Sequence, residues 1–195
     1  MAKHIVIIQG HPDPGRGHFG HALAEAYADG ARRGGHHITE IEIAQLEFPL
    51  LRSKEDFEQR EPPDVIRAVQ ATIARADHLV IFYPLWLGAM PAVVKGFFEQ
   101  VFRPAFVTGT KSLVSTPVRK LKGKSARVVV TMGMPAFIYR WYFGAHSLKN
   151  LQRNILGFCG IKPVKESLIG SVEATDGRRR EKWLARLETL GGDGK

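Results

Sequence analysis

Residues 79–91 read LVIFYPLWLGAMP, and this stretch decides the fold. Its first five residues form a continuous apolar run of strand length that ends at Pro84. A strand that is apolar on both faces is typical of the centre of a parallel sheet with helices on each side. The turn after such a strand lies at its carboxyl end, where open α/β sheets bind their ligands. An exposed Trp86 beside backbone amides in that turn would suit a planar cofactor.

The rest of the chain alternates between strands and helices. Further strands are expected at His4–Gln9, His37–Ile43, Ala126–Met132 and Val164–Gly170. Helices are expected from about His18, from Asp64, from Pro91, from a Ser147 cap, and from Thr175 or Asp176. Two long segments lack a regular period, Ala44–Pro63 and Arg103–Ser125.

Five such units predict a three-layer α/β domain with helices on both faces of the sheet. Right-handed crossovers make the five strands parallel, and the order 2-1-3-4-5 is the common arrangement, with its switch point between strands one and three. Neither an internal repeat nor a linker divides the sequence. A single domain over residues 1–195 is therefore expected.

Composition excludes several classes of protein. The chain of 195 residues is 44% hydrophobic, and its apolar runs are shorter than the roughly 18–20 residues of a membrane span, so no membrane insertion is expected. Met1 leads almost directly into a strand, which argues against a secretion signal and for a cytoplasmic protein. The one cysteine, Cys159, excludes a disulfide scaffold and fits an inert core position. No His, Asp or Glu set has the spacing of a metal site.

The chain is basic, with 28 Lys and Arg against 19 Asp and Glu and a net charge of +9. The basic residues look scattered, apart from clusters at 119–124 and 178–180. Neither cluster is interleaved with aromatic residues as a nucleic-acid platform would be. The charge is therefore interpreted as a solvated basic surface, with no nucleic-acid partner.

The first of three loops that should lie side by side is Gly10–Gly17. It delivers backbone amides to the start of a helix, which favours an anion. It lacks the glycine patterns of dinucleotide sites and P-loops, so a cofactor phosphate fits better than a nucleoside triphosphate. His11 and His18 could donate hydrogen bonds to that phosphate. The alternative is that both are ordinary turn and helix-cap residues.

The second and third loops follow the strands that end near Tyr83 and Met132. Trp86 in the second loop either contacts a ligand or packs, and the sequence leaves both open. In the third loop, Gly133 lets backbone approach a ligand closely. Tyr139 and His146 come after it, and either could give or take a proton. The alternative is a packed tyrosine and a solvated histidine.

Several motifs in these loops resemble those of one known family, the NAD(P)H quinone reductases of the flavodoxin-like superfamily (the DT-diaphorase group and its bacterial relatives). The resemblance runs nearly end to end. It depends on Gly10-His11-Pro12 with Phe19, on Pro84-Leu85-Trp86 followed by Met90-Pro91-Ala92 and Lys95-Gly96-Phe97-Phe98, and on Ile155-Leu156-Gly157-Phe158-Cys159-Gly160.

By this resemblance the protein would have a flavodoxin-like fold and bind a flavin, with FMN slightly favoured by the modest length and FAD the alternative. NAD(P)H would be the co-substrate and a quinone or similar planar acceptor the oxidant, with two electrons passed by hydride transfer in ping-pong kinetics. The resemblance also implies a homodimer. It assigns catalysis to Tyr139 and His146 and flavin binding to His11, His18, Phe19, Pro84, Leu85, Trp86, Leu87, Thr131, Met132, Gly133, Met134 and Arg178.

The third loop departs from the family. Members often have Thr-Thr-Gly-Gly where this chain has Thr131-Met132-Gly133-Met134, followed by Pro135. Three other interpretations therefore stay open: a one-electron flavodoxin carrier, a redox-sensing regulatory subunit of a membrane transporter, and a degenerate member that holds little flavin. The basic charge argues against the carrier, because flavodoxin carriers are generally acidic.

Overall fold

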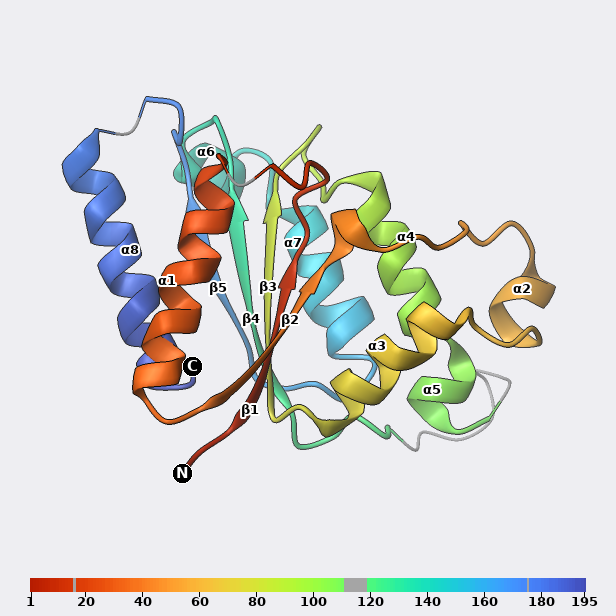
Figure 1. Ribbon diagram of the computed structural model, residues 1–195. Coiled ribbons are helices and arrows are strands. Elements are labelled where there is room, and N and C mark those ends of the chain that lie inside the picture. The colour runs from red at the N-terminus through yellow and green to blue at the C-terminus, as the bar shows by residue number, and fades with distance from the viewer. Residues whose placement is uncertain (16, 111–118, 175) are drawn as a thin grey trace.

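One sheet of five parallel strands organises the chain, and its order is β2-β1-β3-β4-β5 (Figure 1). The computed structural model describes residues 1–15, 17–110, 119–174 and 176–195. The strands are β1 (His4–Gln9), β2 (His37–Glu42), β3 (His78–Pro84), β4 (Ser125–Thr131) and β5 (Val164–Ile169). The predicted topology and fold class are confirmed.

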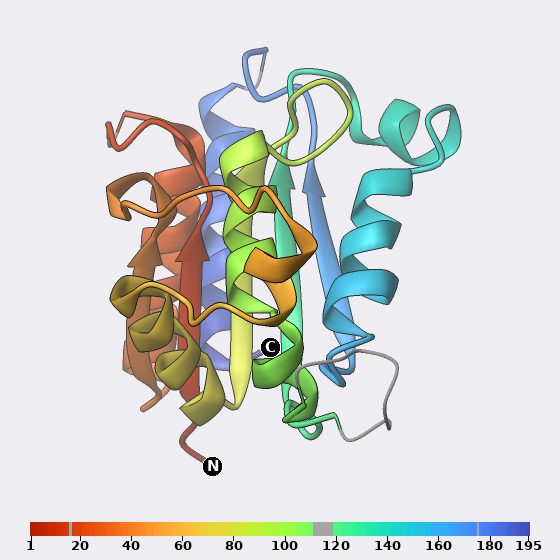
Figure 2. The same ribbon diagram turned by 90° about the vertical axis from the view of Figure 1, so that its right-hand side faces the viewer.

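Helices cover both faces of this sheet (Figures 1 and 2). One face carries α1 (Phe19–Arg33) and α8 (Gly177–Gly192). The other carries α3 (Asp64–Arg75), α4 (Ala92–Val101), α5 (Pro104–Thr108), and α7 (His146–Asn150) continued by a π-helix, Leu151–Leu156. Short elements lie in the connections: a 3₁₀ turn (Ile43–Gln45), α2 (Lys54–Glu58) and α6 (Ala136–Trp141).

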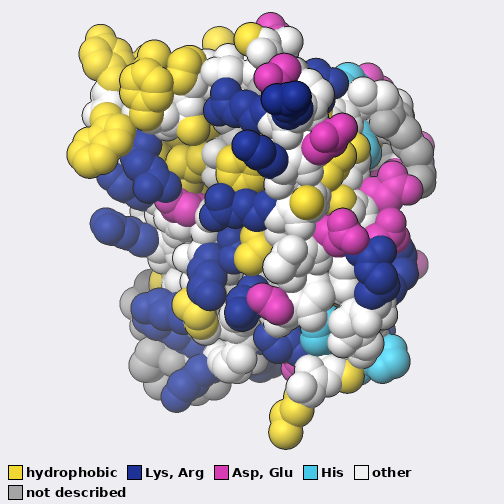
Figure 3. Space-filling model, turned by 90° about the vertical axis from the view of Figure 1, so that its left-hand side faces the viewer, with side chains coloured by type: hydrophobic (Ala, Val, Ile, Leu, Met, Phe, Trp, Pro, Cys, Tyr) yellow, Lys and Arg dark blue, Asp and Glu magenta, His cyan; other side chains and the backbone are white. Residues whose placement is uncertain are grey.

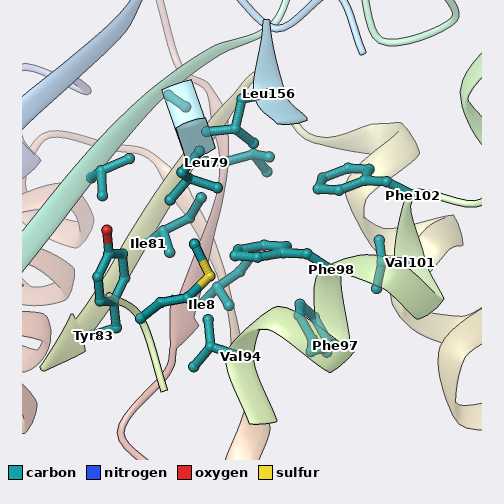
Figure 4. Packing of buried hydrophobic residues seen from close by; sticks show 14 of the residues in the cluster. Ile8, Leu79, Ile81, Tyr83, Val94, Phe97, Phe98, Val101, Phe102 and Leu156 are labelled. Carbon is teal, nitrogen blue, oxygen red and sulfur yellow. The ribbon is translucent and has the colours of Figure 1, made fainter. Parts of the chain in front are cut away.

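The central strand β3 is buried on both faces, as its sequence predicts. Val80 and Phe82 pack under α1 and α8, whereas Leu79 and Ile81 pack on the opposite side. Figure 4 shows this second side, where Phe98 and other side chains of α4 lie over β3. Burying one such side chain contributes about 1.5–3 kcal/mol, so these contacts stabilise β3 at the centre of the sheet.

Glycines let α1 and α8 touch backbone to backbone. A Cβ atom on Gly30 would overlap the carbonyl of Glu188, and one on Gly191 would overlap the carbonyl of Tyr27. No other residue type fits at either position without separating the helices. The two helices therefore form one layer whose relative position is set at this contact.

Local boundaries differ from the sequence expectations in a few places. The second strand ends at Glu42, one residue early, because Ile43 enters the 3₁₀ turn. The predicted Ser147 cap is wrong: Ala145, in a left-handed conformation (φ 48°), precedes the helix, which begins at His146. The two long segments predicted to be irregular contain α2 and α5. Residues 111–118 of the second lie outside the described part.

The start of the last helix was predicted at Thr175 or Asp176. The Asp176 carboxylate accepts a hydrogen bond from the Arg179 amide at 2.8 Å, so Asp176 is confirmed as the cap. Thr175 lies outside the described residues. Among the described residues, no helix is long and apolar enough to cross a membrane.

Candidate functional site

The loops after β1, β3 and β4 begin side by side, because these strands are neighbours in register. The Gly10 amide donates to the Phe82 carbonyl at 2.7 Å, and the Leu85 amide donates to the Thr131 carbonyl at 2.7 Å. A Cβ atom on Gly10 would lie 2.7 Å from that Phe82 oxygen, so only glycine permits the first contact. These bonds tie the three loops into one surface at the carboxyl edge of the sheet.

The first loop is held by Gln9, a buried residue that sequence analysis missed. Its side-chain oxygen accepts from the His11 amide at 3.1 Å, and its side-chain nitrogen donates to the Gly20 carbonyl at 3.2 Å. Gln9 thus connects the loop to the first turn of α1. The only signal in the sequence is a polar residue at the end of an apolar strand.

Imidazoles gather on this loop. The ring of His11 stacks on that of His18 with centroids 3.9 Å apart, and the His21 ring lies 5.4 Å from His11. The Asp13 carboxylate is 2.7 Å from His18 Nε2, and this hydrogen bond lowers the pKa of Asp13. Partial burial lowers the pKa of His11. His21 was missed because a histidine inside a helix carries no signal of its own.

The start of α1 offers open amides beside these imidazoles. Among the described residues, the amides of Gly17, His18, Phe19 and Gly20 have no hydrogen-bond acceptor. Nothing lies within 4 Å of a Cβ atom placed on Gly17 or Gly20. An anion such as a phosphate can therefore approach the backbone directly, which is the chemistry that the sequence predicted for this loop.

Arg180 contacts Phe19 at the start of α1, and the flavin-binding role predicted for Arg178 stays a prediction. The guanidinium of Arg180 lies 5.5 Å from the centre of the Phe19 ring, and it donates to the Val172 carbonyl at 3.3 Å. Arg178 is exposed on the first turn of α8. A cation over an aromatic face is stabilised by the charge distribution of the ring. Arg180 therefore fixes the position of Phe19 at the entry to α1.

The second loop is a tight turn that exposes two apolar side chains. The amide of Trp86 donates to the Ala89 carbonyl, and the amide of Ala89 donates to the Trp86 carbonyl, both at 2.9 Å. Leu87 (φ 48°) and Gly88 (φ 77°) lie between them in left-handed conformations. The side chain of Trp86 is 51% exposed, and that of Leu87 is fully exposed. The Trp86 ring stands edge-on to His11, 6.4 Å away.

The backbone amides of the second loop differ in what they can still bind. Pro84 has no amide hydrogen, and the amides of Leu85 and Trp86 already donate within the protein. The amide of Leu87 has no acceptor among the described residues. Of the four residues predicted to hold a flavin here, Leu87 is thus the one whose amide is open to a ligand.

Only some of the third-loop residues predicted to bind a flavin lie at the surface. Gly133 is exposed and Met134 is half-buried, but the side chain of Met132 is 2% exposed and packs in the core. Thr131 is also buried, and its carbonyl is used by Leu85. The Met132 side chain therefore faces away from the loop surface, and a contact between Met132 and a flavin stays a prediction. The carboxylate of Glu173, which sequence analysis missed, lies 3.7 Å from a Cβ placed on Gly133.

The two predicted catalytic residues have different surroundings. Tyr139 is 1% exposed, burial raises its pKa, and its hydroxyl accepts a hydrogen bond from the Leu148 amide at 3.3 Å. The hydroxyl of Tyr139 therefore faces Leu148 rather than the surface, and its catalytic role stays a prediction that this packing does not support. His146 is exposed at the start of α7, with its ring folded against Gly144. His146 remains a candidate proton donor.

Comparisons with known proteins agree with this architecture. A family model described as a flavodoxin-like fold matches residues 3–190, and the chain belongs to that family. An uncharacterized NAD(P)H oxidoreductase of Haemophilus influenzae is 27% identical over 186 residues, covering 93% of this chain and 90% of the relative. The rat (Rattus norvegicus) NAD(P)H dehydrogenase [quinone] 1 is 26% identical over 220 residues, covering 96% of this chain and 77% of the relative.

A solved structure shares the fold at lower identity. It is an FMN-dependent NADH-azoreductase of Bacillus anthracis in complex with FMN, which superposes with a TM-score of 0.76 at 14% identity and covers 99% of both chains.

Proposed function

We propose that the protein is a flavin-dependent oxidoreductase that passes two electrons from NAD(P)H to a quinone or similar planar acceptor. The observation that carries the proposal is the exposed pair Trp86 and Leu87 beside a loop of open amides and imidazoles. The names of the relatives, an NAD(P)H oxidoreductase and a quinone dehydrogenase, support the same reaction class.

The residues present fit a group that has a phosphate at one end and a flat ring at the other. The phosphate would meet the first-turn amides of α1, with His11 and His18 as side-chain donors and Phe19 held by Arg180. Because burial lowers the pKa of His11, this imidazole gains its positive charge only below the pH at which a free histidine does, and that charge then strengthens binding of an anion.

The ring would lie against the second and third loops. Trp86 and Leu87 offer apolar surface, with Pro84 and Leu85 at its base, and the Leu87 amide offers one open donor. Gly133 lets the ring approach backbone, since a Cβ there would meet nothing closer than 3.7 Å. A bound flavin supplies the hydride chemistry, and the protein supplies orientation and donors. FMN is the proposed flavin, with FAD as the alternative.

The two substrates would use one exposed surface in turn. NAD(P)H and the quinone are both planar at the reacting end, and Trp86 and Leu87 offer a single open apolar face. Sequential use of that face predicts ping-pong kinetics. His146 is proposed to donate a proton to the reduced quinone, while Tyr139 holds the start of α7 through Leu148.

A homodimer is the proposed assembly. Phe137, Trp141, Tyr142 and Phe143 are exposed on and after α6, next to the third loop. Figure 3 shows a cluster of hydrophobic side chains at its upper left. Clustered exposed aromatic side chains are typical of protein interfaces. Light scattering should give a molar mass of twice 21.7 kDa, and a monomer of 21.7 kDa would contradict the dimer.

The central test is to identify and then perturb the cofactor. Chromophore released from freshly purified protein should have the mass of FMN or FAD, and the protein should oxidise NAD(P)H with a quinone. Trp86→Ala should weaken flavin binding by about 5- to 150-fold, from the roughly 1–3 kcal/mol of a stacked aromatic side chain. Trp86→Phe, the matched control, should retain most of it. A colourless protein that takes up neither flavin would end the proposal.

A further inference from the structure

Positive charge is concentrated in one third of the chain. Residues 101–165 contain twelve Lys and Arg and no Asp or Glu, which leaves sixteen basic and nineteen acidic residues for the rest. The whole excess of positive charge therefore comes from this segment. The basic cluster at 119–124 lies within this segment. In Figure 3, Lys and Arg side chains run down the left of the face, below the hydrophobic cluster, while most Asp and Glu lie to the right.

Two cavities share the cations of this segment. One, of about 830 Å³, is lined by Arg119, Arg153 and Lys162 together with Phe158. The other, of about 510 Å³, is lined by Arg119, Lys122 and Lys162. Among the described residues that line the two cavities, none is Asp or Glu. Because Arg119 and Lys162 border both, the two cavities form one basic groove, defined by Arg119, Lys122, Arg153 and Lys162.

The backbone holds the cations of the groove in place. The Lys122 amide donates to the Arg119 carbonyl at 3.1 Å, and the Lys162 amide donates to the Lys124 carbonyl at 2.8 Å. Gly160 (φ 97°) lies under this turn, where a Cβ atom would come within 2.8 Å of the Arg119 Cβ. The turn carrying Arg119 and Lys122 therefore packs directly on the backbone at Gly160, beyond the C-terminal end of the π-helix.

These four cations have no anionic partner in the part of the chain that the structure describes. A cation near a helix C-terminus offsets the helix dipole, and this accounts for Arg153. It does not account for Arg119, Lys122 and Lys162, which precede β4 and β5. Like charges that share a groove repel one another, and a bound anion removes that cost.

We propose that the basic groove binds an anion that carries several phosphates. Four cations around two joined cavities exceed what a single phosphate needs. The groove lies at the amino ends of β4 and β5, and a seven-residue strand separates it by roughly 20 Å from the candidate flavin site at the opposite edge. The clustered phosphates belong either to a free polyphosphate or to the headgroups of an anionic bilayer.

The probes are inorganic tripolyphosphate, followed by calorimetry, and phosphatidylcholine vesicles with or without phosphatidylglycerol, followed by sedimentation. The protein is saturated with FMN beforehand, so that the flavin site does not contribute. Binding in at least one arm, weakened by added salt, is expected. Tripolyphosphate binding alone identifies a soluble anion, and binding to anionic vesicles alone identifies headgroups. Absence of binding in both arms overturns the proposal, whether or not the protein turns out to reduce quinones.

Charge reversal locates the binding. The double variant Arg153→Glu with Lys162→Glu should weaken binding of the anion at least about tenfold, since two cations that attract the anion become carboxylates that repel it. Arg52→Glu with Lys182→Glu makes the same change in net charge on exposed residues outside the groove, and should change binding less than twofold. Equal losses in the two double variants would overturn the proposal. If the reversal variant misfolds by circular dichroism, Arg153→Gln with Lys162→Gln replaces it with a smaller expected loss of about threefold.

Discussion

Leu87→Asn should make the protein more stable and, at the same time, a poorer catalyst. Leu87 occupies the first central position of a two-residue turn in which both central residues have positive φ. Asn-Gly is the pair that this turn type favours, whereas a bulky residue there is an outlier. The Leu87 side chain is fully exposed, so the substitution loses no packing within the protein. The strained conformation of Leu87 therefore does not contribute to the stability of the protein. We expect instead that the Leu87 side chain contacts the electron acceptor.

The size of the effect follows from the backbone. A left-handed conformation costs an ordinary residue roughly 1–2 kcal/mol, and asparagine relieves about half of that. The free energy of unfolding should rise by about 0.5–1 kcal/mol, or about 1–4 °C in Tm for a chain of this length. Unfolding should be followed on flavin-free protein, because a bound ligand adds its own stabilisation.

Leu87→Ala separates strain from contact. Alanine keeps the left-handed backbone without relief, so its unfolding free energy should stay within about 0.5 kcal/mol of the original protein. Both variants lose the apolar surface beside Trp86, so both should lower kcat/KM for the quinone. If Leu87→Asn is no more stable than Leu87→Ala, the reasoning from strain fails. If either variant keeps the full kcat/KM, Leu87 plays no part in acceptor binding.

Three further substitutions test the structure. Gly10→Ala should destabilise by about 1–3 kcal/mol in urea unfolding and weaken flavin binding, because its Cβ would crowd the Phe82 carbonyl at 2.7 Å; unchanged values would contradict that packing. Tyr139→Phe should cost about 1 kcal/mol of stability by leaving the Leu148 amide unpaired, with kcat unchanged; slower turnover at unchanged stability would restore Tyr139 as a catalytic residue. Burial lowers the pKa of His78 from 6.5 to about 3, so its unfolded form binds a proton first as the pH falls. This linkage should remove about 2 kcal/mol of unfolding free energy between pH 7 and pH 5, and His78→Gln should lack that loss when both proteins are unfolded in urea at each pH.

The fold was predictable because its signals are local and repeated. The apolar run of β3 and its neighbours gives the strands, and right-handed connections leave few topologies to choose from. The turn at Trp86 was predictable for the same reason, since Pro84 precedes it and Gly88 lies within it, whereas the sequence left open whether Trp86 is exposed or packed. The unusual start of α7 was not, because the positive φ of Ala145 comes from the turn before it rather than from alanine itself.

The sequence predicts which loops form the candidate site, but it does not predict which side chains of those loops point into it. Arg178, Arg179 and Arg180 are consecutive, and only the packing of α8 on α1 decides that Arg180 meets Phe19. The orientation of Tyr139 was unpredictable for the same reason, because a short helix can place its hydroxyl inward or outward. Such choices depend on contacts between elements far apart in the sequence.

The glycine contact between α1 and α8 reaches further than stability. Both helices begin at the edge of the sheet where the candidate site lies, and their glycine contacts are near their C-terminal ends. These contacts set the angle between the two helices and, with it, the distance between Phe19 and Arg180 at their N-terminal ends. A methyl group added at Gly191 would push the helices apart and weaken the contact between Phe19 and Arg180, although no atom of the site is replaced.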